Sequence, residues 1–122
     1  MITKIITITA FLMLSVSAVA AEPALPPEMK GQWGMNNRSV EIKLIEMQSP
    51  TKARLNVVFW DGCTRRGETT AELKAGAWEF IAPGGMRCDD IAVKIAPVTG
   101  KNRFEGTIQT GGNPKSPIVL EW

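Results

Sequence analysis

The chain has 122 residues, of which 44% are hydrophobic and 21% are charged, with a formal net charge of +2. This length suits one globular domain. The sequence contains no histidine, which excludes a Ser-His-Asp or Cys-His catalytic pair, a His-ligated zinc site and a histidine general base. We therefore expect no enzyme, no cofactor and no metal site.

The first twenty residues have the pattern of a cleaved secretory signal. Lys4 supplies the positive start, an apolar stretch follows over residues 5–16, and Ala18-Val19-Ala20 forms a small-x-small cleavage pattern. An uncleaved anchor is the alternative, but the stretch is shorter than the about 20 apolar residues of a membrane span. Cleavage after Ala20 would leave 102 residues with a net charge of +1. We expect a periplasmic or secreted protein with no stable membrane span and no nucleic-acid partner.

A proline-rich segment follows the cleavage pattern. Residues 21–30 (AEPALPPEMK) contain three prolines and show no apolar period. Proline disfavours regular helix and central strand, so this segment is expected to be an extended leader. The remaining residues, 31–122, are expected to form a single β-barrel-like domain.

Short alternating runs of apolar and polar residues fill the rest of the chain, and turn residues separate them at a spacing near ten. This pattern predicts an all-β fold of about eight strands. The simplest arrangement is a small antiparallel up-and-down meander, a closed or partly open barrel, with a β-sandwich as the alternative. A first strand is expected near Gln32 and Trp33. The inward-facing positions expected on the later strands are Val40, Ile42, Leu44, Ala53, Leu55, Val57, Phe59, Thr69, Ala71, Leu73, Trp78, Phe80, Ile91, Val93, Ile95, Phe104, Gly106, Ile108, Ile118, Leu120 and Trp122.

The meander predicts that alternate connections share one end of the barrel. The irregular ones, 34–39, 61–67, 83–90 and 110–117, alternate with tighter turns and would therefore lie together. Cys63 and Cys88 are the only cysteines, and each falls in one of these connections. In an exported domain they are expected to form a disulfide, because the C-x-x-C pattern of redox proteins is absent.

Charged residues gather in the same connections. Arg65, Arg66 and, across the disulfide, Arg87 could form an anion-binding cluster. The alternative, which we favour, is a solvated loop whose charges are balanced by nearby aspartates. For the acidic residues Asp61 and Asp89-Asp90, backbone capping or pairing with arginine is favoured over acid/base catalysis or calcium binding, because no ligand pattern accompanies them.

Trp60 is the one tryptophan that falls on an otherwise polar strand face, while Trp33, Trp78 and Trp122 fit the inward-facing set. An exposed indole is a platform for a carbohydrate or a protein partner. The alternative, which we favour from the sequence alone, is that Trp60 covers the open end of the core.

The layout resembles a known group of proteins. Gly31-Gln32-Trp33 after a proline-rich leader, eight short strands and a hydrophobic last strand resemble small secreted calycin-like barrels. These include lipocalins, avidins and, nearest in size, disulfide number and Gly-Gln-Trp opening, the secreted bacterial metalloprotease inhibitors. In those inhibitors the first cysteine lies closer to the Gly-x-Trp motif, whereas thirty residues separate Trp33 from Cys63 here. The resemblance implies an N-terminal segment that enters a protease cleft. It would comprise Ala21, Glu22, Pro23, Ala24 and Leu25.

These patterns favour an exported soluble binding module, with an inhibitor of a secreted or periplasmic protease as one form. A lipocalin-like carrier of a small ligand and an envelope structural or interaction protein are the alternatives. The inward-facing set is rich in Trp, Phe, Ile and Leu, which favours a barrel filled by its own side chains over a carrier. The expected partner is another exported protein or, in the carrier reading, a small ligand. Candidate partner-binding residues are Ala21, Glu22, Pro23, Ala24, Leu25, Trp60, Arg65, Arg66 and Arg87.

Overall fold

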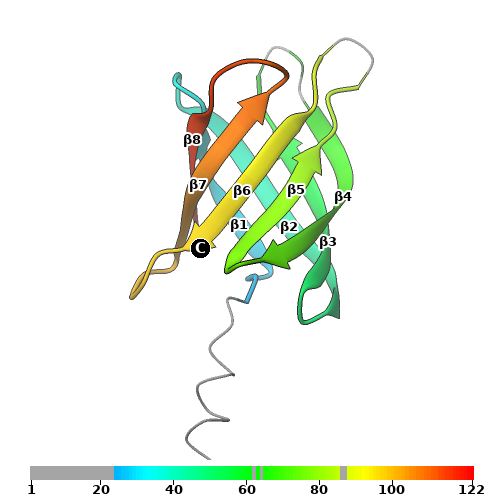
Figure 1. Cartoon of the computed structure of the whole chain (residues 1–122), viewed down its shortest axis with the longest axis vertical. Helices are drawn as coiled ribbons and strands as arrows, with labels where there is room; N and C mark the ends of the chain where they lie inside the picture. The colour runs from blue at the N-terminus through cyan, green and yellow to red at the C-terminus, as the bar shows by residue number, and fades with distance from the viewer. Residues whose placement is uncertain (1–23, 62, 64, 86–87) are drawn as a thin grey trace, which may run out of the picture.

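The computed structural model describes residues 24–61, 63, 65–85 and 88–122. These residues form eight antiparallel strands that follow one another around a closed barrel, and β1 pairs with β8 to complete it (Figure 1). No helix in the described ranges is long and apolar enough to cross a membrane. The strands are β1 (Glu28–Trp33), β2 (Arg38–Ser49), β3 (Lys52–Phe59), β4 (Arg65–Lys74), β5 (Ala77–Ala82), β6 (Ile91–Pro97), β7 (Arg103–Thr110) and β8 (Ser116–Glu121).

The observed order confirms the all-β, up-and-down meander and selects the closed barrel over the sandwich. Successive side chains of a strand point to opposite faces, so the apolar set lines the inside and the polar set the outside. β3 shows this most clearly, since Ala53, Leu55, Val57 and Phe59 are buried while their neighbours are partly or fully exposed. A closed sheet leaves no strand without a neighbour on either side.

Large apolar side chains pack inside the barrel. Among the most deeply buried are Met29, Phe59, Trp78 and Phe104. Trp122 departs from expectation, because its side chain is 44% exposed instead of inward-facing. It follows the last strand and lies against Phe104 from outside the core, with ring centroids 5.3 Å apart. The described core is therefore filled by the protein's own side chains.

The Gly-Gln-Trp sequence has a structural role in closing the barrel. A Cβ atom at Gly31 would overlap the Val119 carbonyl oxygen of β8, so only glycine allows the two backbones to approach this closely. Two residues later, the Trp33 ring packs edge-on against Phe59 at a centroid distance of 5.5 Å. The Trp33 indole Nε1 donates a hydrogen bond of 3.1 Å to the Ser39 carbonyl oxygen.

The leader differs from expectation in its second half. β1 already begins at Glu28, and the Leu25 side chain is only 7% exposed within the core cluster. The Pro27 carbonyl oxygen accepts a hydrogen bond of 2.9 Å from the Leu44 backbone N–H. Residues 25–30 are therefore part of the barrel domain. The sequence did not indicate this, because a single leucine among prolines shows no apolar period although its side chain is buried.

One boundary between strands is weakly paired. β4 and β5 share three residue pairs, from Lys74↔Ala77 to Glu72↔Glu79, whereas β3 and β4 share eight. We call this boundary the β4–β5 seam. The disulfide Cys63–Cys88 joins the connection before β4 to the connection after β5, with a Cα–Cα distance of 6.3 Å. The expected disulfide is present, and it holds together the end of the seam where the strand ladder is missing.

Leu25→Ala tests the contribution of the leader to the core. Removing a buried leucine side chain should lower the free energy of unfolding by about 2 kcal/mol or more. Ala24→Ser, at the exposed neighbouring position, should change it by less than about 0.5 kcal/mol. Urea denaturation of both variants measures the difference. Equal stability of the two would show that Leu25 is not part of the cooperative core.

Replacing both cysteines by alanine tests the seam. The disulfide closes a loop with a sequence separation of 25, so its removal should cost about 3 kcal/mol. Chemical denaturation of the oxidised protein and of the Cys63→Ala/Cys88→Ala variant gives this value. A loss below about 1 kcal/mol would mean that the three-residue ladder closes the barrel by itself.

Candidate functional site

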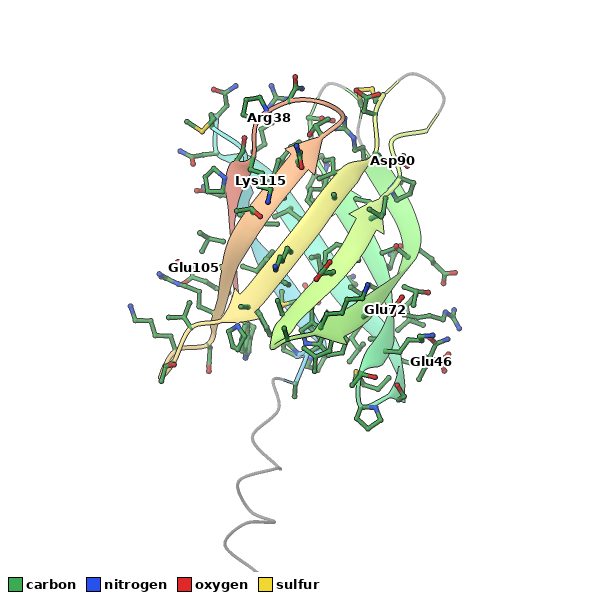
Figure 2. All side chains as sticks on the ribbon, in the orientation of Figure 1. Arg38, Glu46, Glu72, Asp90, Glu105 and Lys115 are labelled. Carbon is green, nitrogen blue, oxygen red and sulfur yellow. A yellow bond between two sulfur atoms is a disulfide. The ribbon has the colours of Figure 1, made fainter. Side chains whose placement is uncertain are left out.

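The irregular connections gather at one end of the barrel, at the top of Figure 1, as the meander predicts. We call this end the rim. Figure 2 shows Arg38, Lys115 and Asp90 near it, while Glu46, Glu72 and Glu105 lie lower on the barrel. The disulfide also lies at the rim. The opposite end carries the β2–β3, β4–β5 and β6–β7 turns.

The structure separates the two adjacent arginines that were expected to share a loop. Both belong to β4, because the pairing with β3 continues through Val58↔Arg66 to Phe59↔Arg65. Neighbouring residues of a strand point to opposite faces. The Arg65 side chain therefore points inward and is 5% exposed, whereas Arg66 is exposed on the outside. The expected Arg65–Arg66 cluster does not form, and Arg87 lies outside the described residues.

Arg65 is held by acceptors from both sides of the seam. Its Nη1 donates to Asp61 Oδ2, and this carboxylate is itself almost fully buried. Its Nε donates to the Asp89 carbonyl oxygen at 2.9 Å, in the connection after β5. Burying a charge is costly unless it is paired and hydrogen-bonded, and both conditions are met here. Arg65 thus serves as a structural crosslink next to the disulfide.

Two aspartates of the rim accept hydrogen bonds from backbone N–H groups, which is the role that the sequence favoured for them. Asp61 Oδ1 accepts a hydrogen bond of 2.8 Å from the Cys63 N–H, and Asp90 Oδ1 accepts one of 2.9 Å from the Gly84 N–H. Within the described part of the chain, no three His, Cys, Asp or Glu residues gather in a way that could hold a metal ion. These acids order the rim connections.

A hollow of about 340 Å³ opens at the rim. We call this hollow the mouth. Its lining includes Trp33, Arg38, Ile108 and the paired Arg65 and Asp61. Arg65 and Asp61 neutralise each other there.

Trp60 lies on the outer wall of the barrel. It follows the buried Phe59 of β3, so its side chain points outward, where it is 37% exposed. Its backbone N–H donates a hydrogen bond of 3.0 Å to the Ser39 carbonyl oxygen of β2, which holds the Trp60 backbone next to the start of that strand. The expected outward orientation is confirmed. We use the name Trp60 wall for the outer surface of β2, β3 and β4 around this residue.

Two hollows flank Trp60, and it lines both of them. The first, which we call the Arg66 hollow, has a volume of about 150 Å³. The second, the Gly31 hollow, has a volume of about 510 Å³. Glu41 also lines both hollows, so the two lie next to each other with the indole between them. The Arg66 hollow is lined by Glu41, Lys43, Asn56, Val58, Trp60 and Arg66, and the Gly31 hollow by Lys30, Gly31, Ser39, Val40, Glu41 and Trp60.

Elsewhere on the outer wall, arginines are tied to carboxylates. Arg54 Nη1 and Nη2 bond Glu46 and Glu68 at 3.0 Å and 3.1 Å. The hydrogen bond to Glu68, followed by the charge of Glu68 and the hydrogen bond to Glu46, raises the pKa of Arg54 above its ordinary value. Hydrogen bonds to Glu121 and then Glu105 do the same for the pKa of Arg103. These arginines are therefore engaged within the protein.

The remaining candidate residues do not form one site. Of the leader candidates, Ala24 is exposed and Leu25 is buried, while Ala21, Glu22 and Pro23 lie outside the described residues. Trp60 and Arg66 come together at one hollow. Lys43 and Asn56 do not stand out in the sequence, since each occupies an ordinary polar position of a strand. Only the strand register brings them to this hollow. The pair Lys43↔Asn56 lies two residues along the strands from the pair Glu41↔Val58, whose members also line it.

Comparison with known proteins finds no match: no family model fits the chain, and neither a curated protein nor a solved structure is significantly similar to it.

Arg65→Gln tests the structural assignment of the buried arginine. It removes the positive charge that pairs with the buried Asp61 carboxylate, which should cost about 3 kcal/mol of unfolding free energy. Arg66→Gln, the same change one residue along β4, should cost less than about 0.5 kcal/mol. Urea denaturation at neutral pH compares them. If Arg65→Gln were as stable as Arg66→Gln, Arg65 would be available for another role.

Proposed function

We propose that this protein is an exported, soluble binding module that recognises another exported protein through the Trp60 wall. The single observation that carries the proposal is the half-buried indole of Trp60 on the outer wall, seated between two hollows. Tryptophan and arginine are enriched among residues that dominate protein interfaces, especially where a pocket adjoins them. Here Trp60 and Arg66 line the same pocket.

The export part of the proposal rests on two features of the chain. The first twenty residues have the pattern of a secretory signal. The disulfide Cys63–Cys88 is consistent with an oxidising compartment outside the cytosol.

The packed interior supports recognition on the outside over carriage of a ligand on the inside. Phe59, Trp78 and Phe104 are among the side chains that fill the described core. A small barrel filled in this way has little room for a guest molecule. The hollow at the rim is lined in part by Arg65 and Asp61, which are already paired with each other.

Inhibition of an exported protease is one form that such binding takes. The calycin-like resemblance would assign that role to the leader, but the buried side chain of Leu25 is unavailable to a partner. The Trp60 wall does not depend on the leader. We therefore base the proposed recognition on the wall.

Trp60→Ala should reduce affinity for the partner at least about 30-fold, as expected for an interface residue of this kind. The protein without residues 1–20 is immobilised and exposed to the exported proteins of its own cells. Retained proteins are identified by mass spectrometry, and the affinity of each is then measured.

Ile81→Ala is the matched control, because Ile81 is a large apolar residue that is 48% exposed on β5, outside the Trp60 wall. It should leave the affinity within about twofold of the parent value. Both variants should keep the parent's melting temperature within a few degrees. A partner that binds Trp60→Ala as tightly as the parent would refute the proposed surface.

A further inference from the structure

The residues that line the Arg66 hollow carry one more positive than negative charge, while Glu28 and Glu68 lie opposite Lys43 and Asn56 on the neighbouring strands. Lys43 and Arg66 line the hollow together with a single carboxylate, that of Glu41. Glu41 is also shared with Lys30, whose Nζ lies 3.8 Å from its Oε1. Among the described residues, neither Lys43 nor Arg66 forms an ion pair with another side chain. Arg54, on the same wall, differs because two glutamates bind it.

The strand register holds these groups side by side. Lys43 lies opposite Asn56, and Val58 lies opposite both Glu41 and Arg66 on its two neighbouring strands. Directly opposed side chains in an antiparallel sheet have Cβ atoms about 5 Å apart. The barrel wall therefore places the ammonium, the guanidinium and the Asn56 amide around one small space. The Trp60 indole completes its side nearest the rim.

The hollow on the other side of Trp60 has a different character. The Trp60 ring and the side-chain-free backbone of Gly31 line it, together with Ser39, the backbone of the inward-facing Val40, and Lys30 and Glu41, which pair with each other. It is larger than the Arg66 hollow and offers apolar surface with balanced charge. An extended segment that crosses Trp60 would meet a cationic space on one side and a more apolar space on the other.

We propose that the Arg66 hollow binds the carboxylate of an acidic side chain on an extended segment of the partner, while a neighbouring apolar side chain enters the Gly31 hollow. Lys43 and Arg66 would donate to the carboxylate, and Trp60 would pack against the carbon chain of the acidic residue. Two adjacent hollows of unequal size and charge suit two different side chains of one peptide better than repeated sugar units. The proposal names the chemistry of the partner and rests on the proposed function of the Trp60 wall.

The test uses nuclear magnetic resonance titration of the mature protein with an acetylated hexapeptide of alternating Glu and Val. The readout is the indole N–H signal of Trp60, identified by its loss in Trp60→Phe, and the backbone N–H signals of Asn56 and Arg66. The matched probe replaces each Glu by Gln. The Glu peptide should shift these signals with saturation, and high salt should weaken its binding. The Gln peptide should bind roughly fivefold or more weakly.

Lys43→Gln and Arg66→Gln should each weaken binding of the Glu peptide roughly fivefold. Lys94→Gln and Lys115→Gln remove the same charge from β6 and from the rim, at positions outside the hollow, and should leave the affinity unchanged. Equal binding of the Glu and Gln peptides, or equal losses in all four variants, would overturn the anion site. Tighter binding of an oligogalacturonate at the same signals would assign the hollow to an acidic sugar and overturn the peptide proposal.

The experiments distinguish failure of the Trp60 wall as the binding surface from failure of the Arg66 hollow as the anion site. If Trp60→Ala abolishes capture of the natural partner while the Glu peptide leaves the Trp60 signal unmoved, the anion site is wrong and the binding surface stands. If the Glu peptide binds as described but Trp60→Ala leaves capture of the partner unchanged, the proposed function is wrong.

Discussion

Closure of the barrel at the β4–β5 seam is the constraint on which the rest of the structure depends. The ladder of paired residues there ends after Glu72↔Glu79. Nearer the rim, two crosslinks instead of strand hydrogen bonds join the β4 side to the β5 side. One is the disulfide Cys63–Cys88. The other is Arg65, which reaches from β4 to the Asp89 carbonyl oxygen. The disulfide acts mainly by lowering the conformational entropy of the unfolded chain. The buried, hydrogen-bonded Arg65 acts on the folded state, where it favours one relative position of the two connections.

This closure is one reason why we propose the outer wall, and not the mouth, as the recognition surface. Arg65 and Asp61 occupy the mouth as a structural pair. On the outside, the strands that carry the Trp60 wall are among the most fully paired, with eight residue pairs between β3 and β4. Side chains on a rigid sheet lose less freedom on binding than those on a loop. The wall therefore holds the backbone positions of Lys43 and Arg66 in a fixed register.

The sequence predicted the barrel, the disulfide and the outward-pointing Trp60, because period-two alternation and turn spacing report directly on a sheet with one buried face. It did not predict that β4 begins at Arg65, since a charged residue in an inward position breaks the apolar pattern. One of its two partners, Asp89, is also distant in sequence. Leu25 was missed because one leucine among prolines has no period. The alternation of β2 stops after Leu44, where a bulge shifts the register and the apolar Ile45 and Met47 become exposed. The Arg66 hollow requires the register of three strands, which alternation alone does not determine.

The most direct test of the account places a photoreactive residue at Asn56 in the Trp60 wall, at Met35 in the mouth, or at Ala24 in the leader. Each protein is irradiated in the exported fraction of its own cells, and crosslinked partners are identified. The account predicts that the partner is crosslinked from Asn56 and not from Met35 or Ala24. Crosslinking chiefly from Met35 would contradict it in favour of the mouth, and chiefly from Ala24 in favour of an inhibitor-like leader.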